Sequence, residues 1–168
     1  GYIKRTALNT YRTQRRGGRG VQGAMSKEED FVEHLFIANT HNYMLFFTDQ
    51  GKCYWLKVYD IPQGGRAARG RAIVNLIGCD PGEKIEAFVS VKEFDDSHYI
   101  AMATRNGIVK KTVLSAYGKP RKGGIYAIEI RDGDKLIEAR VTNGEHDILL
   151  GTSAVSYTHL TLPTIITV

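Results

Sequence analysis

The chain has 168 residues, of which 42% are hydrophobic and 24% charged, with a net charge of +5. This balance excludes a disordered polypeptide and predicts a packed core. No apolar stretch approaches the roughly 18 residues needed to span a bilayer, and the start does not resemble a signal peptide, so we expect a cytoplasmic protein. Because the sequence begins at Gly1 without Met, we expect it to be a fragment.

Short apolar or alternating runs, separated by Gly, Asn and Asp, predict an all-β fold. Residues 26–30 offer a helix start as a capping box, which nothing sustains. "TDQGK" around Gly51 and "TRNGI" around Gly107 predict hairpin turns in which glycine supplies a positive φ. The predicted strands are, in chain order, 34–38, 43–47, 53–58, 72–76, 85–89, 99–103, 108–113, 126–130, 136–141 and 147–150.

A repeat organises these strands. Three segments align without gaps when their turn glycines, Gly1, Gly51 and Gly107, are superposed, and each enters a glycine- and arginine-rich cluster about fourteen residues later. The glycine spacings of 50 and 56 residues predict propeller-like blades, each a four-stranded sheet. Apolar residues recur at the eighth and eleventh positions of the copies, which are Leu8, Val58 and Leu114, then Tyr11, Ile61 and Tyr117.

The basic clusters of the three copies are 14–20, 64–70 and 120–126. In the alignment without gaps, Arg16 matches Arg66 and Lys122, and Arg19 matches Arg69. A disordered tail has no reason to recur in register inside a β repeat. The remaining matches are Gly20 with Gly70, and Gly17–Gly18 with Gly123–Gly124.

The C-terminal residues 154–168 break the repeat. Residues 155–164 correspond to the codons GTC TCT TAT ACA CAT CTG ACG CTG CCG ACG, which look like a transposon adapter from a DNA sequencing library. We therefore expect 154–168 to be translated adapter and exclude it from the fold. The rest divides into blade parts at about 1–34, 35–96 and 97–153.

Positive charge is concentrated near the N-terminus, where no Asp or Glu occurs before residue 28. Such a concentration favours a polyanion, because each neutralised phosphate releases a counterion. In "QRRGGRG", residues 14–20, glycine lets backbone N–H groups approach phosphates, and arginine donates bidentately to phosphate oxygens. Neither interaction distinguishes bases, so we expect sequence-tolerant, salt-dependent binding to duplex DNA. A basic face that only aids solubility is the alternative.

Other kinds of site have weaker signals. A match to the dinucleotide-binding fingerprint begins at Gly18 but lacks the strand before it and the sustained helix after it. The five histidines have no metal-ligand spacing, so no metal site is expected. We expect Cys53 and Cys79 to be reduced, buried thiols, and Trp55 to be a core residue rather than a platform for single-stranded nucleic acid.

The residues quoted above resemble a known family. "QRRGGRG", "EEDFVEHLFIANTHNYMLFFTDQGKCYWLKVYDIP", "ARGRAIVNL" and "MATRNGIVKKT" are similar to the C-terminal domain of the DNA gyrase A subunit, from residue 1 to about 153. The resemblance implies a β-pinwheel, a propeller-like disc of about six blades, of which this chain supplies an open set of about three. It also implies that the domain wraps duplex DNA, so that gyrase introduces negative supercoils at the expense of ATP.

The resemblance assigns DNA contact to the seven-residue box, in which Arg19 stands where lysine is commonest. No catalytic residue is expected, because the family's active-site tyrosine lies upstream; Tyr2, Tyr11 and Tyr54 do not take that role. The box is Gln14, Arg15, Arg16, Gly17, Gly18, Arg19 and Gly20, and the repeat adds Arg66, Arg69, Arg121 and Lys122.

The resemblance also implies partners. ATP and Mg²⁺ would be bound by the cleavage core and by the gyrase B subunit of an A2B2 holoenzyme, and no cofactor is expected in this chain. The implied location is the bacterial cytoplasm, in association with the nucleoid. Two alternatives stay open. One is the A-type subunit of topoisomerase IV, whose C-terminal domain shares the blade fold but usually lacks an intact box. The other is a propeller-type scaffold for protein interactions.

Overall fold

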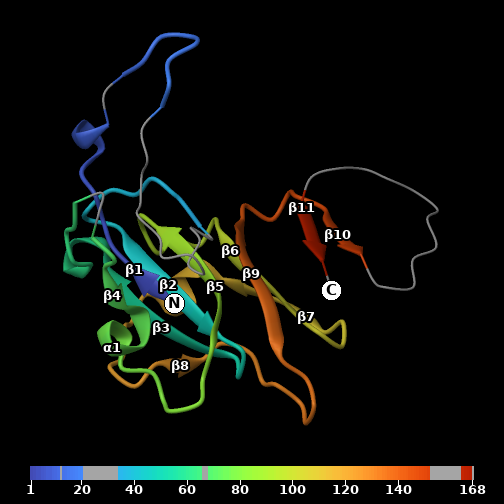
Figure 1. Ribbon diagram of the computed structural model, residues 1–168. Coiled ribbons are helices and arrows are strands. Elements are labelled where there is room, and N and C mark those ends of the chain that lie inside the picture. The colour runs from blue at the N-terminus through green and yellow to red at the C-terminus, as the bar shows by residue number, and fades with distance from the viewer. Residues whose placement is uncertain (12, 21–33, 66–67, 152–163, 168) are drawn as a thin grey trace.

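The computed structural model describes residues 1–11, 13–20, 34–65, 68–151 and 164–167. Its strands form successive small sheets (Figure 1): a four-stranded sheet of order β5-β2-β3-β8, a three-stranded sheet of order β7-β6-β9, and the pairs β1-β4 and β10-β11. The strands are β1 (Tyr2–Ile3), β2 (Tyr43–Thr48), β3 (Lys52–Lys57), β4 (Arg71–Ala72), β5 (Ile85–Val91), β6 (Tyr99–Thr104), β7 (Val109–Val113), β8 (Ile125–Tyr126), β9 (Leu136–Thr142), β10 (Ile148–Gly151) and β11 (Thr164–Thr167).

The all-β prediction is confirmed. The predicted strands 43–47, 53–58, 85–89, 99–103, 108–113, 136–141 and 147–150 correspond to β2, β3, β5, β6, β7, β9 and β10. The predicted hairpin turns are also present: Gly51 and Gly107 have φ of +80° and +83°, and they connect β2 to β3 and β6 to β7. The predicted helix start at 26–30 lies outside the described residues.

The predicted strand at 72–76 is wrong. Only Ala72 is in a strand, and Ile73–Ile77 forms the short helix α1. Ile73, Leu76 and Ile77 share one helical face and pack on the core, which overrides the β preference of this branched run. Gly78 ends the helix in the left-handed conformation, with φ +62°.

Two further predicted strands are mostly irregular. Residues 34–38 make no strand pairing with the described residues, although the rings of His34 and Phe36 pack on Phe88. Of the predicted strand 126–130, only Tyr126 lies in a strand. The N–H groups of Ala127 and Ile128 both donate to the carbonyl of Gly51 instead of continuing the strand pairing.

The three copies have the same local structure. Each continues into a 3-10 helix at its eighth position, namely η1 (Leu8–Thr10), η2 (Val58–Asp60) and η3 (Leu114–Tyr117). The second and third copies also share a bulge after Phe47 and Ala103, before a buried threonine. The predicted repeat is therefore structural. Val58 and Leu114 are buried, whereas Leu8 is 67% exposed.

Each repeat contributes a short strand to the sheet of the repeat before it. β8, from the third copy, pairs with β3 and sets Ile125 opposite Cys53. β4, from the second copy, pairs with β1 and sets Arg71 opposite Ile3. A basic cluster precedes both of these strands, so the exchange fixes each of these two clusters against the preceding repeat.

The alignment without gaps is wrong by two residues in the third copy. A Cβ on Gly70 would lie 2.3 Å from the carbonyl oxygen of Ile3. A Cβ on Gly124 would lie 2.9 Å from the carbonyl oxygen of Cys53, which is the residue equivalent to Ile3 in the second copy. Gly124, rather than Tyr126, therefore occupies the place of Gly70. By the same shift, Lys122 corresponds to Ala68 instead of Arg66, and Gly123 corresponds to Arg69.

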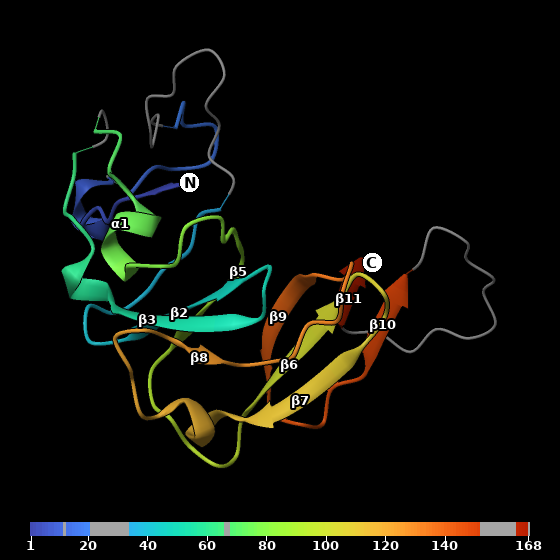
Figure 2. The ribbon, with the colours of Figure 1, turned by 90° about the horizontal axis from the view of Figure 1, so that it is seen from below.

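The main core lies between the two larger sheets, which Figure 2 shows side by side. Leu45 and Phe47 of β2 face Ile100 and Met102 of β6, all with no exposed surface. The opposite face of β2, with Met44 and its neighbours, packs on α1 and β1 in a second cluster. Because β2 is buried on both faces, its sequence is continuously apolar.

The prediction of buried thiols is confirmed for one cysteine, and the prediction of a core tryptophan is confirmed in part, because Trp55 is only partly buried. Cys53 is buried as predicted, whereas Cys79 is only half-buried. Trp55 packs against the main core and its indole N–H donates to the carbonyl of Tyr117 at 2.9 Å. In the part of the chain that the structure describes, no helix has the length and apolarity to cross a membrane.

Candidate nucleic-acid interface

The box, residues 14–20, forms an exposed loop closed by two internal hydrogen bonds. The N–H of Gly20 donates to Gln14 Oε1 at 2.8 Å, and the N–H of Gly18 donates to the carbonyl of Arg15 at 3.0 Å. Gly17 and Gly20 have φ of +81° and +68°, a region that other residues rarely adopt. The glycines therefore make the turn itself possible.

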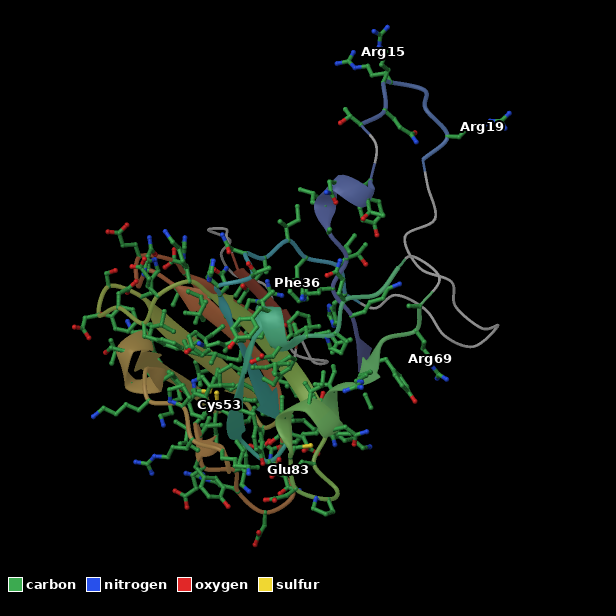
Figure 3. All side chains as sticks on the ribbon, turned by 90° about the vertical axis from the view of Figure 1, so that its left-hand side faces the viewer. Arg15, Arg19, Phe36, Cys53, Arg69 and Glu83 are labelled. Carbon is green, nitrogen blue, oxygen red and sulfur yellow. The ribbon has the colours of Figure 1, made fainter. Side chains whose placement is uncertain are left out.

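The cations of this loop point into solvent. Figure 3 shows Arg15 and Arg19 at the outer end of the loop, directed away from the body of the protein. Within the described residues, neither Arg15, Arg16 nor Arg19 has an ion-pair partner, and the backbone N–H groups of Arg16, Gly17 and Arg19 donate to no internal acceptor. Guanidinium and amide donors with this exposure can bind phosphate oxygens from one side.

The second cluster, 64–70, is anchored on the first repeat. The carbonyl of Gly64 accepts from the Thr6 hydroxyl at 3.0 Å, and the carbonyl of Gly65 accepts from Lys4 Nζ at 3.1 Å. The guanidinium of Arg69 lies over the ring of Tyr2, with 4.2 Å to the centroid. This cation–π contact holds Arg69 while its side chain remains at the surface.

The role of Tyr2 could not be predicted from the sequence, because the contact comes from the preceding repeat and no spacing within the cluster indicates it. Arg66, the other predicted contact of this cluster, lies outside the described residues.

The third cluster ends in a tight turn. The N–H of Gly124 donates to the carbonyl of Arg121 at 3.0 Å, which leaves Arg121 and Lys122 exposed at the tip, and Lys119 is exposed beside them. No ion pair to a described residue engages Arg121 or Lys122. The structure thus places those predicted residues that it describes on separate turns of successive repeats rather than in one pocket.

A buried ion pair anchors the strand that follows this turn. Lys52 Nζ lies 3.3 Å from Oε1 of Glu83, whose side chain is 1% exposed, and also contacts Asp80. The hydrogen bond that the Lys52 ammonium donates to Asp80, together with the carboxylate of Glu83, raises the pKa of Lys52. The Lys52 ammonium also lies 5.4 Å from the ring centroid of Tyr126 in β8. One lysine therefore connects the second repeat to the third.

Replacing Lys52 with methionine is expected to destabilise the protein by about 3–5 kcal/mol, because Glu83 would be left as an uncompensated buried charge. Urea unfolding would measure this loss. The double variant Lys52→Met, Glu83→Met should recover most of it, since an apolar pair can replace a buried ion pair at little cost. Equal losses in the single and double variants would contradict this account.

Two groups that could support other chemistry, Cys53 and Asp95, are buried or engaged in hydrogen bonds. Burial raises the pKa of the Cys53 thiol, which is therefore a poor nucleophile. The hydrogen bond to His98 lowers the pKa of Asp95 to about 2, and both belong to an exposed turn. Over the described ranges, no group of three or more His, Cys, Asp or Glu residues is arranged to hold a metal ion.

Comparison with known proteins places this fold and loop in one class. Residues 1–39, 42–92 and 98–143 match the model of the DNA gyrase C-terminal domain, a β-propeller. The chain belongs to this family of DNA gyrase C-terminal domains. The all-β, pinwheel-like architecture agrees with it.

The relatives are gyrase A subunits. The chain is 51% identical to the DNA gyrase A subunit of Clostridium acetobutylicum over 153 residues, and 51% identical to that of Neisseria gonorrhoeae over 150 residues. These matches cover 91% and 89% of this chain, but only 18% and 16% of the relatives. The chain therefore corresponds to a small part of the proteins it matches.

Two solved structures share the fold. The C-terminal domain of DNA topoisomerase IV superposes with a TM-score of 0.72 at 30% identity, covering 87% of this chain and 44% of that one. The DNA gyrase A C-terminal domain gives 0.63 at 25% identity, covering 84% and 45%.

Proposed function

We propose that this chain is part of the DNA-wrapping domain of DNA gyrase and that it binds duplex DNA through the box loop. The observation that supports the proposal is the exposed, internally closed loop that presents Arg15, Arg16 and Arg19 to solvent. Its donors match phosphate oxygens and none is positioned to select a base sequence. The expected ligand is therefore the backbone of a duplex.

Successive clusters extend the proposed contact. Bending a duplex by 40–90° over 20–30 base pairs costs about 1–6 kcal/mol, so several phosphate contacts must offset it. Arg69 in the second cluster, and Arg121 and Lys122 in the third, are the further cations that we assign to this path, together with Arg66. The clusters come from successive repeats, and the second and third are each held against the repeat before them, so the proposed contacts are spaced along the DNA.

In the holoenzyme, the wrapped segment would be delivered to a cleavage gate elsewhere in the A subunit. We assign ATP binding to a B subunit in an A2B2 assembly, and Mg²⁺ to the cleavage core and that B subunit, in the bacterial cytoplasm with the nucleoid. This chain's contribution is to bind and bend DNA, without a catalytic residue or cofactor of its own.

A salt titration tests the proposal. Fluorescence anisotropy of a labelled duplex should give a steep log–log dependence of affinity on salt, because each phosphate contact contributes a slope of about −0.9. The variant Arg15→Ala, Arg16→Ala, Arg19→Ala should lose up to about 2.7 of this slope, the sum of three contacts.

A matched control removes three exposed lysines outside the clusters, at Lys84, Lys92 and Lys135. This control lowers net charge equally and should retain most of the slope. Weak, salt-insensitive binding by the unaltered protein would instead favour the protein-interaction scaffold.

The second candidate function is that of the topoisomerase IV A-type subunit, which the superposition on that protein's C-terminal domain favours. The intact box in this chain argues for gyrase. A supercoiling assay on relaxed plasmid, with the full-length protein and its matching B subunit, distinguishes the two. Introduction of negative supercoils identifies gyrase, and relaxation alone identifies topoisomerase IV.

A further inference from the structure

Gln14 differs from the other residues of the box in the direction of its side chain. Its Oε1 accepts the N–H of Gly20 at 2.8 Å, six residues along the chain, and so joins the two ends of the loop. Gly18 lies directly against this side chain. A Cβ on Gly18 would stand 2.6 Å from Gln14 Oε1 and 3.0 Å from Gln14 Cβ.

The three glycines therefore have different functions in the loop. Gly17 and Gly20 have positive φ and open space where a Cβ would stand, so their backbone conformation alone favours glycine. Gly18 has no positive φ, and the Gln14 side chain against it is what chiefly excludes a larger residue. The packing of Gly18 on Gln14 indicates a loop built around the glutamine.

We propose that Gln14 is a positioning residue, which acts by closing the loop so that Arg15, Arg16 and Arg19 are presented in one arrangement. The inference rests on the proposed DNA-binding function. A loop that is already closed loses less conformational freedom when it binds, and the same charges then bind more tightly. Gln14 is neutral, so it contributes no counterion release of its own.

Amide hydrogen exchange in the DNA-free chain tests loop closure without reference to DNA. The Gly20 amide should be protected in the unaltered protein, and Gln14→Leu should accelerate its exchange at least tenfold because leucine has no acceptor. Gln14→Glu keeps an acceptor oxygen and should keep the protection. Equal Gly20 exchange in the unaltered protein and the leucine variant would overturn the proposal.

DNA affinity tests the consequence of closure. Gln14→Leu should weaken duplex binding about tenfold at every salt concentration, whereas the triple arginine variant reduces the salt slope. Gln50→Leu, the same change at an exposed turn outside the loop, should have no effect. Unchanged affinity in Gln14→Leu would overturn the positioning role. Salt-insensitive DNA binding by the unaltered chain would instead overturn the proposed function. The hydrogen-exchange experiment tests loop closure alone, so the two failures can be distinguished.

Discussion

Full-length A subunit that carries alanine at positions 15, 16 and 19 is expected to lose negative supercoiling while it still relaxes DNA. The three guanidinium groups are exposed and have no ion pair to the described residues, so their removal should not disturb the fold. If the proposed function holds, the variant loses about three phosphate contacts and can no longer offset the cost of bending the duplex. Supercoiling of relaxed plasmid with ATP and the B subunit should fall at least tenfold on agarose gels.

The control for this experiment is the Lys84, Lys92 and Lys135 triple alanine variant, which should supercoil normally. Relaxation measured without ATP reports whether the cleavage gate remains intact. Normal supercoiling by the arginine variant would contradict the assignment of the box loop to wrapping. Loss of both activities would point to misfolding instead, and circular dichroism of the purified variant distinguishes that case.

The sequence was sufficient for features that depend on local pattern. The hairpins at Gly51 and Gly107 follow from glycine in a turn flanked by apolar strands, and the repeat follows from their spacing. The exposure of Arg15 and Arg19 could also be expected, because charged residues beside glycine in a polar run have no apolar surface to cover.

Features that depend on another repeat could not be predicted. The helix at Ile73–Ile77 forms because its apolar face meets a core built from distant strands, and short apolar runs do not distinguish helix from strand. The stacking of Arg69 on Tyr2 joins residues from different repeats. The two-residue shift of the third copy in the repeat alignment was revealed by the close approach of Gly124 to the backbone of Cys53.

Gly51→Ala is expected to be strongly destabilising, with a loss of about 3–5 kcal/mol in the free energy of unfolding from backbone strain, displaced backbone and broken hydrogen bonds. Positive φ costs a non-glycine residue about 1–2 kcal/mol. A Cβ would also stand 2.2 Å from the carbonyl oxygen of Ile128 and must displace that segment. Displacement breaks the hydrogen bonds from Ala127 and Ile128 to Gly51 and exposes Ile128, which is 4% exposed. Urea unfolding measures the loss.

Gly107→Ala is the matched control, because it makes the same change at the equivalent turn. Gly107 has nearly the same φ, +83° against +80°, but no atom of the described structure lies within 4 Å of its Cβ position. The Gly107→Ala variant should therefore lose only the free energy that a positive φ costs a non-glycine residue, about 1–2 kcal/mol. The difference between the variants measures how strongly the third repeat holds the second. Equal losses would mean that the 127–128 segment contributes little, and that the repeats are joined mainly by the core between their sheets.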